Sequence, residues 1–195
     1  MSKRGPAALF VAAVLLAGCG SSGPSFRNTD ITGADYGRDF TLTDHSGRVR
    51  SLADFRGKVV VMFFGYTRCP DVCPTTLAEL KAVREQLGED GKRVQVLFVT
   101  VDPERDTPQL LANYVPAFDP SFIGLYGNSA AIAKVAKDFR VFYQKVPGRT
   151  PDSYTVDHTA GSYVFDPRGQ LRLFARHGNP ANLVADIRVL MNTPG

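Results

Sequence analysis

Two continuous apolar runs, VVVMFFG at residues 59–65 and VQVLFVTV at residues 94–101, constrain the fold of this chain most strongly. Both are rich in β-branched and aromatic side chains, which is the pattern of strands that are buried on both faces of a sheet. Between them, residues 74–87 carry leucine and valine at helical spacing. The middle of the chain therefore predicts buried central strands with a helix between them.

The flanking segments extend this pattern in both directions. The turn sequences DHSG and DPRG each separate two short apolar segments, which predicts two hairpins. Thr107 and Pro108 are typical of the N-cap and first residue of a helix. The segments expected to form the hairpins and three further helices are residues 40–52, 107–114, 130–139, 162–175 and 182–191. This order implies an α/β fold with a central mixed sheet and helices on both faces. With a cysteine pair after the first buried strand, it resembles the thioredoxin fold with an N-terminal β-hairpin extension.

The N-terminus has the pattern of an export signal. Lys3 and Arg4 precede an apolar run at residues 7–16, which is short for a membrane span, and LAGC follows at residues 16–19. This pattern resembles a bacterial lipoprotein signal, in which Cys19 becomes the lipidated first residue. A plain secretory signal and an uncleaved anchor are alternatives. All three export the chain, and the first predicts a membrane-anchored lipoprotein facing the periplasm or the cell exterior.

The rest of the chain predicts one exported domain on a tether. Residues 1–18 form the signal, residues 19–35 the lipidated cysteine and a Gly/Ser-rich flexible tether, and residues 36–195 the folded domain. The 195-residue chain is 44% hydrophobic, enough for a single core. Without the signal, 21 basic and 19 acidic residues remain, a net charge of +2. This balance argues against nucleic acid as a partner.

Two cysteines lie in the stretch GYTRCPDVCPTTL at residues 65–77. Cys69 precedes Pro70 and Cys73 precedes Pro74, and a residue before proline is steered away from the helical region. We therefore expect both cysteines in a strand-to-helix loop, with Cys73 as the N-cap, where the helix dipole favours a thiolate. A structural disulfide is the alternative, but it would close a loop too short to constrain the unfolded chain much.

A histidine could complete a metal site with these thiols. His45 falls in a predicted hairpin turn and is expected at the surface, and His177 is expected in a loop just before the last helix. His158 lies in VDHTAGS, immediately before a predicted strand, where thioredoxin-like redox enzymes usually carry a cis-proline. No proline occurs between residues 152 and 166. Two thiolates and one imidazole suit Cu(I), and also Cu(II) or Zn(II).

Three motifs together carry a family resemblance. GYTRCPDVCPTTL, VTVDPERDTP at residues 99–108 and VDHTAGSYVFDPRG at residues 156–169 resemble, in this order, the SCO/SenC family of copper-delivery proteins for cytochrome c oxidase. The resemblance covers about residues 35–192. It implies that Cys69, Cys73 and His158 bind copper. It also implies a metallochaperone that takes copper from an unidentified donor and helps to assemble the binuclear copper centre of an oxidase subunit.

Other functions and roles remain open from the sequence. Cys69 and Cys73 could instead form a dedicated thiol-disulfide oxidoreductase that reduces the acceptor's cysteines, and a thiol peroxidase is a weaker alternative. Asp102 and Asp106 are expected at a strand end and a helix cap, with a weaker possibility of tuning the site. Asp157 could orient His158, and Met62 is expected in the core.

Overall fold

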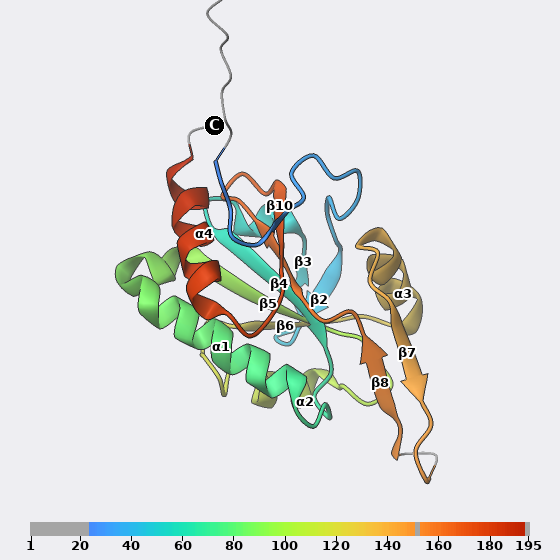
Figure 1. Ribbon diagram of the computed structural model, residues 1–195. Coiled ribbons are helices and arrows are strands. Elements are labelled where there is room, and N and C mark those ends of the chain that lie inside the picture. The colour runs from blue at the N-terminus through green and yellow to red at the C-terminus, as the bar shows by residue number, and fades with distance from the viewer. Residues whose placement is uncertain (1–23, 151–152, 194–195) are drawn as a thin grey trace, which may run out of the picture.

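The computed structural model describes residues 24–150 and 153–193, and within them an eight-stranded mixed sheet forms the centre of the domain (Figure 1). The sheet has the order β1-β10-β9-β4-β5-β6-β2-β3, and β7 and β8 form a separate two-stranded sheet. The strands are β1 (Thr29–Asp30), β2 (Leu42–Asp44), β3 (Val49–Arg50), β4 (Val59–Gly65), β5 (Val94–Thr100), β6 (Ile123–Tyr126), β7 (Tyr143–Val146), β8 (Thr155–His158), β9 (Ser162–Phe165) and β10 (Leu171–Ala175). The helices are α1 (Val72–Leu87), α2 (Pro108–Tyr114), α3 (Ser129–Asp138) and α4 (Pro180–Asn192), with 3-10 turns at Leu52–Phe55 and Gly88–Arg93.

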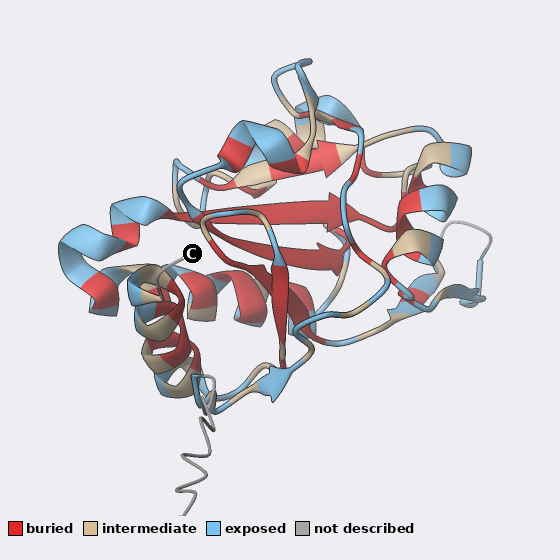
Figure 2. Ribbon diagram, turned by 90° about the horizontal axis from the view of Figure 1, so that it is seen from above, coloured by how far each residue is buried: buried red, intermediate tan, exposed pale blue. Residues whose placement is uncertain are grey.

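The two apolar runs form the central strands, as predicted. β4 and β5 pair in parallel along their whole length, from Val59 opposite Val94 to Gly65 opposite Thr100. β9 pairs antiparallel with the other edge of β4. Every residue of β4 and β5 is buried, and these strands lie in the middle of the molecule in Figure 2. Continuous apolar sequence is required here because helices cover both faces of these strands.

Helices pack on both faces of the sheet. On one face, α1 and α4 lie side by side (Figure 1). Phe98 of β5 packs against Tyr114 of α2 on that same face. On the opposite face, Phe64 of β4 packs against Phe139 at the end of α3. The thioredoxin-like α/β fold predicted from the sequence is confirmed, and both predicted hairpins, β2–β3 and β9–β10, are present.

The structure differs from the sequence expectation in three elements. β6 lies between β5 and β2, where no strand was predicted. The segment that carries His158 is not a loop but strand β8, paired with β7 in a hairpin that extends from the main body (Figure 1). Both strands have polar, partly exposed sequences, so the apolar pattern that revealed the core strands is missing from them.

The N-terminal boundary of the domain also differs. Residues 27–32, expected in a tether, are bound to the fold: β1 pairs with β10, and the Arg27 backbone N–H donates to the Asp186 carboxylate at 2.8 Å. The folded unit therefore includes part of the segment assigned to the tether. The predicted signal and Cys19 lie outside the described residues. Within the described ranges, no helix is long and apolar enough to cross a membrane.

Candidate metal centre

The first functional element is the loop that joins β4 to α1. The helix begins at Val72 with Asp71 as its N-cap, so Cys73 is its second residue and Pro74 its third. The prediction that Cys73 is the N-cap is therefore wrong by two residues. The first four N–H groups of a helix have no partner within it, so a proline is tolerated throughout the first turn and not only at its first position.

The sulfur of Cys73 lies in a fully buried position against the end of β4. A Cβ atom at Gly65 would come within 2.9 Å of this sulfur and of the Phe63 and Phe98 rings, so only glycine leaves room for it. Burial raises the pKa of the Cys73 thiol, and the hydrogen bond from the Tyr66 backbone N–H acts in the opposite direction. The expected stabilisation of the thiolate by the helix N-terminus is thus outweighed by desolvation in the metal-free protein.

Cys69 is the more accessible of the two cysteines. Its sulfur accepts a hydrogen bond from the Cys73 backbone N–H at 3.4 Å, which holds the two ends of the loop together. Both cysteines are free thiols, and no disulfide joins them in this structure. The structural-disulfide alternative therefore does not describe this state of the protein.

His158 faces the two sulfurs from the end of β8. Its Nδ1–H donates to the Thr159 carbonyl at 3.1 Å, which directs Nε2 toward the Cys73 sulfur, 3.7 Å away. The imidazole packs edge-on against the rings of Phe63 and Tyr66. Burial lowers its pKa, so the ring is neutral at pH 7 and Nε2 keeps the lone pair that a metal ligand needs.

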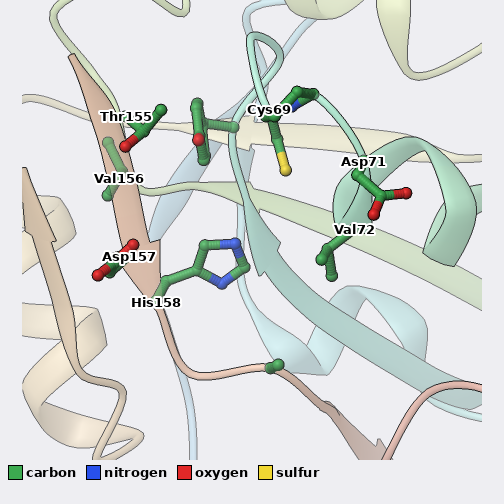
Figure 3. Close-up of a pocket in the computed structure, with 10 residues that line it drawn as sticks. Cys69, Asp71, Val72, Thr155, Val156, Asp157 and His158 are labelled. Carbon is green, nitrogen blue, oxygen red and sulfur yellow. The ribbon is translucent and has the colours of Figure 1, made fainter. Parts of the chain in front are cut away.

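One ligand atom from each of Cys69, Cys73 and His158 lies within 4.8 Å of the other two. Figure 3 shows the Cys69 sulfur and the His158 ring pointing toward each other across a pocket of about 300 Å³. Two sulfurs and one imidazole nitrogen form a soft, low-coordinate donor set that suits Cu(I) better than Mg²⁺ or Ca²⁺. The structure thus brings together the three residues that the sequence singled out.

Comparison with known proteins agrees with this geometry. A model of the SCO1/SenC family matches residues 28–192. The chain belongs to the SCO1/SenC family. The "Protein SCO2 homolog, mitochondrial" of Bos taurus is 44% identical over 150 residues, which are 76% of this chain and 56% of that protein. The chain thus spans little more than half the length of this relative and of its human and mouse counterparts.

Two solved structures of this family are close in shape. The copper-bound ScoI of Bradyrhizobium japonicum superposes with a TM-score of 0.73 at 42% identity, covering 80% of this chain and 99% of that one. The apo Sco1 of Thermus thermophilus gives a TM-score of 0.76 at 44% identity, covering 85% and 97%. The SCO1/SenC fold is therefore shared over nearly the whole described domain.

Asp106 of this SCO1/SenC protein does not cap a helix. It supports the loop between β4 and α1, residues 66–71, which we call the cysteine loop. Its buried carboxylate accepts hydrogen bonds from the Thr67 backbone at 3.1 Å, the Thr67 hydroxyl at 2.6 Å and the Thr100 hydroxyl at 2.6 Å. The cap of α2 is Thr107, as predicted. Burial raises the pKa of Asp106, although the hydroxyl donors oppose this shift. Sequence reasoning placed Asp106 in the right motif but missed its contact with the loop of Cys69.

The other two histidines connect neighbouring elements of the fold, and Asp157 lies at the surface. His45 Nδ1 accepts from the Gly124 backbone N–H at 3.0 Å, joining the N-terminal hairpin to β6. His177 lies in a loop before α4, as expected, but it is half-buried and bridges the hydroxyls of Thr76 and Ser162 at 3.1 and 3.2 Å, contacts that the sequence did not indicate. Asp157 is exposed, and the Thr159 carbonyl orients His158 in its place.

Proposed function

We propose that this SCO1/SenC protein is a copper metallochaperone that holds copper with Cys69, Cys73 and His158. The observation that carries the proposal is the approach of the three ligand atoms to within 4.8 Å of one another, with Cys69 and His158 lining an open pocket. The soft sulfur donors favour Cu(I), and the imidazole also allows Cu(II). The site is partly accessible through Cys69, as release of a cargo metal requires.

The acceptor that fits this family is the copper-site subunit of cytochrome c oxidase. In this proposal, an incoming cysteine or histidine of that subunit replaces the ligands one at a time, beginning at the accessible Cys69. The donor that loads the site is a separate protein or small ligand.

The second candidate function is a dedicated thiol-disulfide oxidoreductase. The free thiols of Cys69 and Cys73 lie next to each other, one accessible and one buried, which is the arrangement of an attacking and a resolving cysteine. In that reaction the two thiols lose two electrons and two protons to an acceptor disulfide, which becomes two thiols. His158 has no required part in this exchange, so it separates the two functions.

We propose that the domain works on the outer side of a membrane. The LAGC sequence at residues 16–19 supports lipidation of Cys19, which would anchor the domain and face it toward the periplasm or the cell exterior. Mass spectrometry of the membrane-bound protein should find a lipid on Cys19 as the first residue, and Cys19→Ala should lose that lipid while leaving the metal site intact. A mature protein whose Cys19 carries no lipid would contradict the lipid anchor.

The decisive experiment measures Cu(I) retention by the reduced, anaerobically purified domain against a competing chelator. We expect one Cu(I) per chain in the wild type and a large loss in Cys69→Ser and His158→Ala. His45→Ala is a matched control, since His45 lies outside the site, and it should retain copper. A domain that takes up no copper, or only zinc, would contradict the metallochaperone. Oxidase assembly that survives His158→Ala but not Cys69→Ser would favour the reductase.

A further inference from the structure

The β7–β8 hairpin carries His158 at one end of β8, and it contacts the main body through Tyr154 at the other end. Tyr154 directly precedes β8 and lies four residues before His158. At about 3.3 Å per residue, this places the two α-carbons about 13 Å apart along the strand. β8 pairs only with β7 among the described strands, and Figure 1 shows the hairpin extending away from the sheet. Its attachment at Tyr154 therefore bears directly on where His158 can lie.

Asp102, Arg105 and Tyr154 form this attachment, which we call the Tyr154 clamp. The Tyr154 hydroxyl donates to Asp102 Oδ1 at 2.7 Å, and Arg105 Nη1 donates to the Tyr154 carbonyl at 2.9 Å. The Arg105 guanidinium also lies 3.5 Å from the centre of the Tyr154 ring and is ion-paired with Asp102. Each of the three residues thus contacts the other two.

The clamp is built from buried charge. Asp102 is fully buried, and the Arg105 side chain is 11% exposed. A buried ion pair contributes little net stability, but removing one partner leaves a charge without compensation. Such a cluster is better suited to fixing one geometry than to strengthening the fold. Burial and the hydrogen bond to Asp102 raise the pKa of Tyr154, so its hydroxyl remains a donor.

A second contact connects the clamp with the metal ligands. The Arg105 guanidinium also lies 5.9 Å from the centre of the Tyr66 ring. Tyr66 packs edge-on against the His158 imidazole, and its hydroxyl pairs with the backbone of Val156 in β8. Arg105 therefore contacts both tyrosines, and both tyrosines contact the segment that presents His158.

We propose that Asp102, Arg105 and Tyr154 are positioning residues that hold His158 at its place beside the two sulfurs. This inference rests on the proposed copper site and adds to it the role of the DPER sequence at residues 102–105. Without the clamp, β8 would move relative to the cysteine loop, and the site would retain two sulfurs but lose its imidazole. The clamp acts through His158 and does not itself contact the metal.

The first test needs no metal. Hydrogen exchange of the amides of residues 155–158 is measured in the reduced, metal-free protein. In Tyr154→Ala we expect exchange about tenfold faster or more in this strand, with the core strand β4 unchanged. Unchanged exchange in β8 would overturn the proposal. Tyr154→Phe keeps the ring and loses only the hydroxyl, so it should give a smaller change and serves if the alanine variant does not fold.

The second test is a double-mutant cycle on Cu(I) affinity with His158. Tyr154→Ala should weaken Cu(I) binding by about 10- to 100-fold, as is typical when a supporting residue of a metal ligand is removed. In a His158→Ala background the same change should have no further effect, because the ligand it positions is gone. The Cu(II) form of Tyr154→Ala should also lose the nitrogen couplings of an imidazole ligand. Additive losses, or retained nitrogen couplings, would overturn the proposal.

A matched control exists elsewhere in the fold. Arg172 lies 5.5 Å from the centre of the Phe26 ring and forms a buried ion pair with Asp166, a similar cluster at the turn of the β9–β10 hairpin. Phe26→Ala should change neither exchange in β8 nor copper affinity. A wild-type domain that binds no copper would overturn the proposed function. Hydrogen exchange in β8 needs no copper, so it would still test the role of the Tyr154 clamp. Failure of the proposed function can therefore be told apart from failure of the clamp.

Discussion

Gly65 lies where the main chain of β4 approaches the Cys73 sulfur too closely for a side chain to fit. Its backbone forms the last position of β4, and the Cys73 sulfur lies against it together with the Phe63 and Phe98 rings. The rings belong to the core and the sulfur to the site, so a side chain at this position would disturb both. The glycine is required by close approach and not by an unusual backbone angle.

Gly65→Ala should therefore weaken copper binding and destabilise the fold together. The new methyl group would force the Cys73 sulfur away from its position, and overpacking of a core costs about 1–3 kcal/mol. Denaturant unfolding and Cu(I) competition measure the two effects. Gly124→Ala is the control: it would contact Val115 and Leu111 but no sulfur, and should lower only stability. Normal copper affinity in Gly65→Ala would contradict this account of the site.

The sequence could identify the three candidate ligands that the structure brings together, but not the groups that orient them. Cys69, Cys73 and His158 stand out because thiols and imidazoles are scarce in this chain and chemically distinctive. The Thr159 carbonyl that orients His158 is a backbone group, and no sequence pattern marks it. His177 looked like an ordinary loop residue because its burial depends on Thr76 and Ser162, which are far from it in sequence.

At the scale of elements, the loop between β4 and α1 is held by a carboxylate from another segment. Asp106 binds both the backbone and the side chain of Thr67, and it also binds Thr100 at the end of β5. Asp106 thereby joins the end of β5 to the start of the cysteine loop that follows β4. The geometry of that loop depends on this connection.

Asp106→Asn should loosen the cysteine loop without removing a ligand. The amide cannot accept all three hydrogen bonds, and an unsatisfied buried partner costs about 1–3 kcal/mol. We expect lower stability and faster hydrogen exchange in residues 66–71. Thr67→Val, which loses only the hydroxyl donor, should give a smaller effect in the same segment. Wild-type exchange in both variants would show that Asp106 does not hold the loop.

The elements that the sequence failed to predict share a physical cause. β6 has four residues, and β7 and β8 are polar and partly exposed, so none carries a strong periodic signal. The start of α1 was placed too late because proline was assigned to the first helical position, although the whole first turn tolerates it. Long apolar segments such as β4 and β5 were predicted correctly because burial on both faces leaves them no alternative.

At the scale of the whole molecule, half-buried histidines connect stability to pH. Burial lowers the pKa of His177 from 6.5, with Glu79 opposing and His158 adding to this shift. The unfolded chain therefore binds a proton more readily than the folded one as pH falls below about 6.5. Because protons bind the unfolded chain more readily, folding stability decreases as pH falls through this range.

His177→Gln should reduce this acid sensitivity. Glutamine can still bond to Thr76 and Ser162 but does not titrate, so its stability should depend less on pH between 6.5 and 5. Denaturant unfolding of the metal-free protein at several pH values measures the slope. Equal slopes in the variant and the wild type would show that His177 does not contribute to the pH dependence.

Two segments far apart in the sequence supply the proposed copper site with two sulfurs and one imidazole nitrogen. X-ray absorption at the copper edge of the reduced, Cu(I)-loaded domain counts these donors directly. We expect two sulfur neighbours and one imidazole nitrogen in the wild type, with loss of the nitrogen in His158→Ala. A spectrum with no sulfur neighbours, or one identical in the wild type and His158→Ala, would contradict the proposed site.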